Sequence, residues 1–184
     1  MAYRNGTYIA FHADGTNEVG KSDLKYYNLI KAWTAKTDDS FSFIDSHDKA
    51  SSVRDSSKKE TLRRSLIQRL SNSKNMVLII GDTTKNDTDW VPFEIEQAID
   101  KYQLPIIAAY TGYNHIMKPA DLGHLWPKSL ATRISSKAAK IIHIPFKQEA
   151  LSTAIAQYSV HKENSLGPLS YYSKAVYLKW GYMG

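Results

Sequence analysis

The sequence has no cysteine among its 184 residues. This absence excludes disulfide bonds, cysteine-ligated zinc and a thiol nucleophile. Its apolar runs are all much shorter than the roughly 20 residues that a helix needs to cross a bilayer, and residues 1–6 lack the apolar core of a signal peptide. We therefore expect a soluble cytoplasmic protein with no membrane partner.

Several motifs of common enzymes are also missing. The chain contains no Gly-x-Gly-x-x-Gly fingerprint and no Gly-x-Ser-x-Gly nucleophile elbow. Its six histidines are scattered, without the i, i+4 spacing of a helical metal site. The sequence predicts neither a metal site nor a resident cofactor.

Charge is unbalanced, with a net value of +6. Such an excess fits either nucleic-acid binding or attraction of an anionic small molecule. Much of the excess lies in five basic residues between 58 and 69, at spacings that place several of them on the outer face of one amphipathic helix. A solvated helix face is the favoured interpretation, and no nucleic-acid-binding signature accompanies the charge.

Strand-like and helix-like segments alternate along the chain. Short apolar runs at 7–12, 41–44, 76–81, 104–110 and 141–144 predict strands, and the intervening segments carry helical periodicity, except for an irregular stretch at 111–136 with room for a short helix. This alternation predicts an α/β fold with a central parallel sheet of about five strands and helices on both faces.

The chain divides into two parts by composition. We expect one domain over residues 1–162 and an aromatic C-terminal extension over 163–184, rooted at Gly167 and Pro168. Packing of the extension on its own domain is favoured, and packing on a partner stays open.

The most informative stretch is residues 87–99, which follows the apolar run 76–81. Asp89 is placed to cap a helix that carries Trp90 and Glu94 four residues apart, hence on one face. This helix begins at the carboxyl edge of the sheet, where open α/β folds bind ligands. The helix dipole is expected to favour ionised Glu94, whereas Glu96 lies on another face and is expected to be solvated.

Several segments together resemble the TIR-like (Toll/interleukin-1 receptor) family, and most closely the ThsB-type proteins of bacterial Thoeris anti-phage defence. The likeness spans roughly residues 5–160. It is carried by residues 8–17, 46–49, 53–58, 73–81, 90–95 and 106–113. The resemblance implies a single TIR/flavodoxin-like domain.

It also implies an enzyme of the NAD nucleosidase or ADP-ribosyl cyclase type, with Glu94 as the catalytic residue. NAD is the substrate and no other cofactor is required. The product is a cyclic ADP-ribose isomer that activates a partner effector of the ThsA type. A homo-oligomer is also allowed, because TIR sites are often completed by a neighbouring loop.

Other residues are candidates for substrate binding, each with a structural alternative. Trp90 is suited to stacking on nicotinamide or adenine, or to core packing, and His12 to contacting phosphate or ribose, or to a structural role. Phe11 closes the first strand at the ligand edge and is expected to form an apolar wall with Trp90. The remaining candidates lie in polar loops, where they bind substrate, cap turns or contact a neighbouring subunit: Asp14, Asn17, Asp48 and Arg54.

Two non-enzymatic interpretations compete with the enzyme. One is a TIR-like adaptor that acts by self-association, and the other is a receiver-like signalling domain. The Trp90–Glu94 spacing favours the enzyme, because an adaptor has no need of a carboxylate there. The receiver interpretation is weakened, because the first strand does not end in an acidic pair.

Overall fold

The computed structural model describes residues 4–13, 23–36, 43–44 and 56–184. Within these ranges all strand pairings are parallel, and one six-stranded sheet has the order β2–β1–β3–β4–β5–β6. The strands are β1 (Gly6–Ala10), β2 (Phe43–Ile44), β3 (Ser73–Ile80), β4 (Ile106–Tyr110), β5 (Ile141–Pro145) and β6 (Ser170–Tyr171). The predicted α/β fold is confirmed, with a short sixth strand added by the C-terminal segment.

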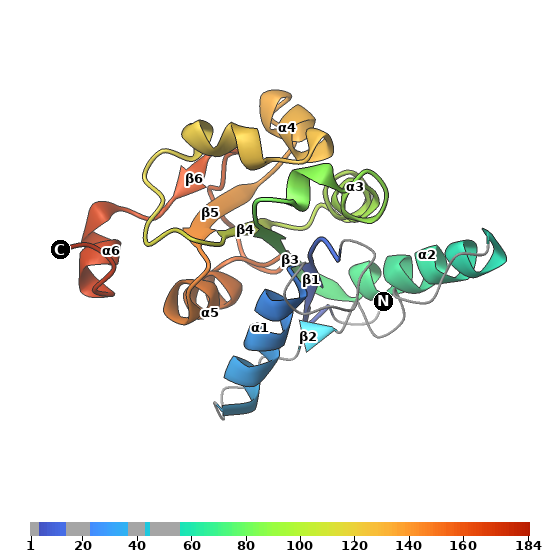
Figure 1. The fold of residues 1–184 in the computed structure, drawn as a ribbon, viewed down its shortest axis with the longest axis horizontal. Helices are drawn as coiled ribbons and strands as arrows, with labels where there is room; N and C mark the ends of the chain where they lie inside the picture. Colours follow the sequence, from blue (N-terminus) through green and yellow to red (C-terminus); the bar gives the residue numbers. More distant parts are fainter. Residues whose placement is uncertain (1–3, 14–22, 37–42, 45–55) are drawn as a thin grey trace.

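Helices cover both faces of this sheet (Figure 1). Residues of α2, α3 and α4 pack on one face, and residues of α1, α5 and α6 pack on the other. The helices are α1 (Leu24–Lys36), α2 (Ser56–Ser71), α3 (Trp90–Glu96), α4 (Lys128–Ser135), α5 (Gln148–Gln157) and α6 (Lys174–Lys179). Helix α4 is the short helix for which the irregular stretch 111–136 left room.

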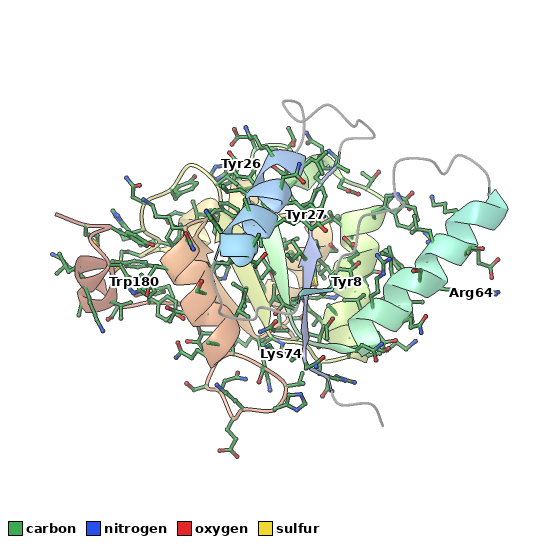
Figure 2. All side chains as sticks on the ribbon, turned by 90° about the horizontal axis from the view of Figure 1, so that it is seen from below. Tyr8, Tyr26, Tyr27, Arg64, Lys74 and Trp180 are labelled. Atoms are coloured by element: carbon green, nitrogen blue, oxygen red, sulfur yellow. The ribbon has the colours of Figure 1, made fainter. Side chains whose placement is uncertain are left out.

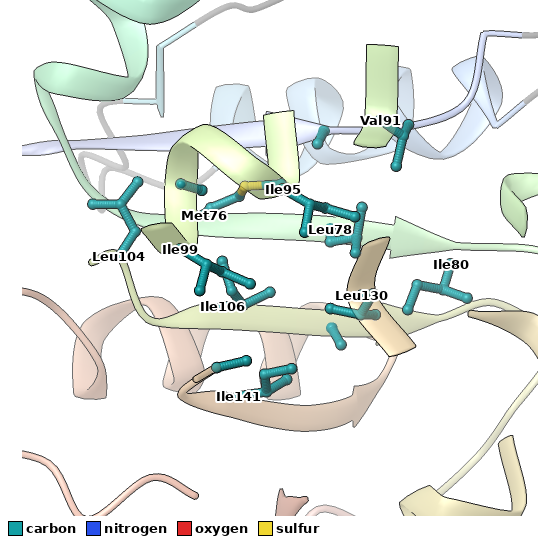
Figure 3. Packing of buried hydrophobic residues seen from close by; sticks show 14 of the residues in the cluster. Met76, Leu78, Ile80, Val91, Ile95, Ile99, Leu104, Ile106, Leu130 and Ile141 are labelled. Carbon is teal, nitrogen blue, oxygen red and sulfur yellow. The ribbon is translucent and has the colours of Figure 1, made fainter. Parts of the chain in front are cut away.

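The core is a set of aligned apolar rows that run across the strands. Met76 of β3 pairs in register with Ile106 of β4, which pairs with Ile141 of β5. Figure 3 shows these side chains beneath Ile95 and Ile99 of the helical segment above them. The central strands are buried on both faces, which is why the sequence carries continuous apolar runs there instead of alternation.

Strand β3 begins at Ser73, three residues before the apolar run that predicted it. The cause is a buried polar residue, Asn75, whose hydrogen bonds tie three elements together. Its side-chain oxygen accepts from the Thr7 hydroxyl at 2.8 Å, and its amide donates to the carbonyls of Ile155 and Tyr158 at 3.1 and 2.6 Å. A strand residue that is polar but fully satisfied does not stand out in a hydropathy pattern.

The C-terminal segment packs on the rest of the chain. Strand β6 pairs with β5, and the buried Tyr177 donates its hydroxyl to the carbonyl of Ile116 at 3.2 Å. The rings of Tyr172, Tyr177 and Trp180 contact one another, with Tyr172 and Trp180 edge-to-face at 5.1 Å. The division of the chain at residue 162 stays a prediction.

Across the described ranges, every helix falls short of the length and apolarity that a membrane span requires.

Candidate functional site

The loop between β3 and α3 fixes where helix α3 begins. The side-chain oxygen Oδ1 of Asp87 accepts hydrogen bonds from the backbone amides of Asp89 and Trp90, both at 2.9 Å. Asp89 takes the N-cap position, as predicted, but its side chain makes no capping hydrogen bond, and Asp87 supplies the side-chain cap. The Asp89 carboxylate turns outward instead and pairs with Lys59 and Arg63 of α2.

A second contact joins this loop to the end of β1. His12 Nδ1 lies 3.1 Å from Asp87 Oδ2, and both side chains are about nine-tenths buried. His12 thus contacts the residue whose side chain caps α3. This contact gives His12 the structural role that the sequence left open, and a role toward substrate stays a prediction.

A third contact joins α1 to the same loop. The Thr84 hydroxyl donates to Asp23 Oδ2 at 2.8 Å and accepts from the backbone amide of Gly81 at 2.8 Å. Asp23 packs so closely that a Cβ at position 81 would lie 2.4 Å from Asp23 Oδ1. A residue with a Cβ would displace the buried Asp23 carboxylate, so glycine suits this point where the chain leaves β3.

Glu94 is a buried residue of α3 and is 1% exposed. Its Oε1 accepts a hydrogen bond from the hydroxyl of Tyr8 on β1 at 2.5 Å. Its Oε2 is buried and has no hydrogen-bond partner. A buried polar atom without a partner costs on the order of 1–3 kcal/mol.

The electrostatics of Glu94 differ from the sequence-based expectation. Burial raises its pKa to about 8, the hydrogen bond from Tyr8 lowers it in part, and the charge of Asp87 raises it further. The helix dipole, which was expected to favour ionised Glu94, is outweighed by desolvation of the buried carboxylate. Glu96 is exposed, as predicted.

Trp90 is half-buried against the core on the same side as Glu94. Its ring lies near two cations of α2, with Lys59 Nζ 5.6 Å and Arg63 Cζ 6.0 Å from the ring centroid. These contacts are typical of cation–π pairing. The structure shows core packing for Trp90, and stacking on a substrate ring stays a prediction.

Phe11 lies on the opposite face of the sheet from Tyr8. It is buried in the cluster of α1 and α5 and stacks on Tyr27 with 4.9 Å between ring centroids. The expectation that Phe11 and Trp90 form one apolar wall is wrong, because Phe11 lies three positions after Tyr8 and side chains alternate between the two faces along an extended chain.

Four predicted binding residues lie outside the described residues: Asp14, Asn17, Asp48 and Arg54. Their roles toward substrate stay predictions. Among the described ranges no group of three or more histidine, aspartate or glutamate residues is arranged to hold a metal ion.

Two residues of this site were not singled out from the sequence. Tyr8 appeared as one of several strand residues, and Asp87 as loop. Placing β1 beside β3, as the flavodoxin-like strand order requires, would have put Tyr8 under the helix that follows β3. For Asp87 the available signal was an aspartate in the polar loop two residues before Asp89, a spacing suited to an Asx turn.

The arrangement therefore presents one carboxylate oxygen without a partner, in a desolvated site at the ligand-binding edge of an α/β sheet. Such an oxygen is suited to accept a hydrogen bond from a hydroxyl or to stabilise positive charge that develops on a substrate. A family model described as the TIR-like domain of the Thoeris protein ThsB matches residues 8–115.

The chain belongs to this family. The match covers more than half of the chain, from Tyr8 through α3 and β4, and so includes the whole Tyr8–Asp87–Glu94 arrangement. It stops short of the residue 160 that the resemblance reached. The chain is thus a TIR-like protein of the Thoeris defence type, a system that has further components.

Proposed function

We propose that this ThsB-type chain cleaves the glycosidic bond between nicotinamide and ribose in NAD. The observation that supports the proposal most directly is the partnerless, buried Oε2 of Glu94. It lies on the helix that follows β3, at the edge where open α/β sheets bind ligands. No other described glutamate or aspartate has a buried carboxylate oxygen without a partner.

Glu94 would act on the charge that cleavage creates. As the bond from the ribose carbon to nicotinamide breaks, its electron pair leaves with nicotinamide, and positive charge develops on the ribose. An ionised carboxylate stabilises this oxocarbenium-like state. Because burial raises the pKa of Glu94 to about 8, activity is expected to increase as the pH rises toward that value.

The fate of the ribose cation determines the product. We propose that a hydroxyl of the same ADP-ribose attacks the cation and gives a cyclic isomer, while the proton of that hydroxyl passes to a base and then to solvent. Capture within one bound molecule is strongly favoured when water is excluded from the substrate complex. The cyclic isomer would serve as a diffusible signal to an effector of the ThsA type.

Burial of Glu94 also supports a restrained resting state. A substrate cannot contact a side chain that is 1% exposed without some rearrangement around it. We propose that the isolated protein is weak or silent until a trigger or assembly exposes the site. Strong turnover that stays linear in enzyme concentration down to high dilution would contradict an assembly requirement.

The test compares two glutamates of the same helix, Glu94 and Glu96. Glu94→Gln is nearly isosteric and is expected to lower NAD turnover about 100- to 1,000-fold. Glu96→Gln alters an exposed residue two positions away and should leave turnover within about twofold of the wild type. The measurement is nicotinamide release from an activated preparation, with mass spectrometry of the second product.

Each outcome has a distinct meaning. A folded Glu94→Gln protein with normal turnover would overturn the assignment of Glu94. Linear ADP-ribose, which is heavier than the cyclic isomer by one water, would reduce the protein to a simple NAD hydrolase. No nicotinamide release under triggering conditions would favour the adaptor function instead.

A further inference from the structure

The hydroxyl of Tyr8 is the hydrogen-bond donor that holds Glu94. Tyr8 projects from β1 in the middle of the molecule, whereas Trp180 lies at one end of it (Figure 2). Tyr8 is 0% exposed, and its hydroxyl lies 2.5 Å from Glu94 Oε1, across 86 residues of sequence. When Glu94 is ionised, a hydroxyl donor at this distance makes a charge-assisted hydrogen bond.

This bond makes the two carboxylate oxygens different. Oε1 is occupied by Tyr8, whereas Oε2 is buried and without a partner. In the absence of the Tyr8 bond the carboxyl group could rotate and exchange the two oxygens, because terminal sp³–sp² torsions have broad minima. With the bond in place, one defined oxygen is left for a ligand.

We propose that Tyr8 is a positioning residue for Glu94, which holds Oε1 so that Oε2 alone is presented to the substrate. The proposal rests on the proposed function for its consequence in catalysis. In this role Tyr8 contacts no reacting atom. Its effect on the reaction passes through the carboxylate that it orients.

The surroundings of Glu94 make this effect measurable. Burial raises the pKa of Glu94 to about 8, the Tyr8 bond lowers it, and Asp87 raises it. The other described titratable groups nearby are engaged with partners of their own: His12 with Asp87, and Lys59 and Arg63 with Asp89. Removal of the Tyr8 hydroxyl should therefore raise the pKa of Glu94 further, because the bond favours the charged form.

The experiment measures this titration directly in the full chain without substrate. The protein is labelled with ¹³C at the glutamate carboxyl carbons, and the Glu94 signal is assigned by its loss in Glu94→Gln. In Tyr8→Phe we expect the titration midpoint of Glu94 to increase by about one pH unit or more. In Tyr177→Phe, which removes another buried hydroxyl that bonds to the Ile116 carbonyl, the midpoint should not move.

Kinetics then separate positioning from general damage. Tyr8→Phe should lower kcat for NAD about tenfold or more while KM stays within about twofold. Its pH–rate profile should shift to higher pH by the same amount as the titration midpoint. A folded Tyr8→Phe protein whose Glu94 midpoint is unchanged would overturn the proposal.

A second substitution covers the case in which Tyr8→Phe fails to fold. 3-Fluorotyrosine at position 8 keeps the hydroxyl and makes it a stronger donor, so the Glu94 midpoint should decrease; an unchanged midpoint would again overturn the proposal. If these midpoints move as expected but the activated wild type cleaves no NAD, the proposed function fails. The hydrogen bond by which Tyr8 positions Glu94 is then still supported.

Discussion

Two buried polar centres lie on the same face of the sheet, and they are built in opposite ways. One is Glu94, which has one oxygen bonded to Tyr8 and one without a partner. The other is His143 of β5, where every ring nitrogen is satisfied. His143 Nε2 lies 2.9 Å from the carbonyl of Pro168, and Nδ1 lies 2.7 Å from the hydroxyl of Tyr110.

The direction of the bonds around His143 follows from its neighbours. A carbonyl can only accept, so Nε2 carries the proton and donates to Pro168. Nδ1 must then accept from the Tyr110 hydroxyl, whose oxygen accepts from Trp126 Nε1 at 2.7 Å. The result is a directed chain that ties β4, β5 and the C-terminal segment together around a neutral histidine.

The difference shows how burial serves two purposes in one core. Around His143 every polar group has a partner, so burial stabilises the fold and fixes the C-terminal segment. Around Glu94 one acceptor lacks a partner, so burial costs stability and leaves an oxygen for a ligand. The stability contributed by the two centres should therefore change with pH in opposite directions. Loss of a tyrosine hydroxyl should lower NAD turnover at the Glu94 centre but not at the His143 centre.

The largest expected effect is on stability at alkaline pH in Glu94→Gln. The native pKa of Glu94, about 8, lies above its ordinary value of 4.5, so the wild type loses stability as the pH rises from 4.5 to 8. The variant lacks this loss. Its free energy of unfolding should increase relative to the wild type across this interval by up to roughly 5 kcal/mol, as measured by urea denaturation at several pH values. Glu96→Gln should show a constant difference, and a constant difference for Glu94→Gln as well would contradict the prediction.

The next effect is the acid dependence that His143 introduces. Burial lowers its pKa to about 4 from 6.5, so the native state loses stability as the pH falls from 6.5 to 4, by up to roughly 3 kcal/mol. Glu94 acts in the opposite direction over part of this interval, so the two are separated by variants. His143→Leu should be less stable at neutral pH and should lose this acid slope, whereas the exposed His124→Leu should keep it. An unchanged slope in thermal unfolding of His143→Leu would refute the assignment.

A smaller effect is expected for Tyr110→Phe, which leaves His143 Nδ1 and Trp126 Nε1 without their partner. We expect a loss of about 2 kcal/mol, or a decrease in Tm of about 4–8 °C. Tyr171→Phe, at an exposed position, should have almost no effect. Nicotinamide release should remain at the wild-type level in a folded Tyr110→Phe protein, in contrast to Tyr8→Phe. Equal effects of the two tyrosines on turnover would remove the distinction between the centres.

The smallest effect should come from Trp126→Phe, which removes one donor at the end of the chain of bonds. The Tyr110 hydroxyl keeps His143 as its acceptor, so about 1 kcal/mol of stability should be lost. Thermal unfolding checks this, and a loss larger than that of Tyr110→Phe would show that Trp126 acts mainly through packing.

Much of the fold could be predicted from the sequence, because hydrophobic periodicity indicates which segments are buried. The runs at 76–81 and 104–110 predicted β3 and β4, and the helix from Trp90 was located by its spacing. The polar start of β3 and the two-residue β6 were missed, because Asn75 is satisfied by distant carbonyls and β6 is defined by its pairing with β5. A local sequence pattern does not show which distant residues a segment will contact.

For the site, the sequence by itself determined that a glutamate stands on the second turn of a helix after a central parallel strand, and that Glu96 faces away. Only the tertiary structure decided that Tyr8 holds Glu94, that Asp87 caps the helix, and that Phe11 points to the other face. The reason is physical. A pKa, a hydrogen bond and an unpaired oxygen depend on groups that are distant along the chain, and strand order and register bring those groups together.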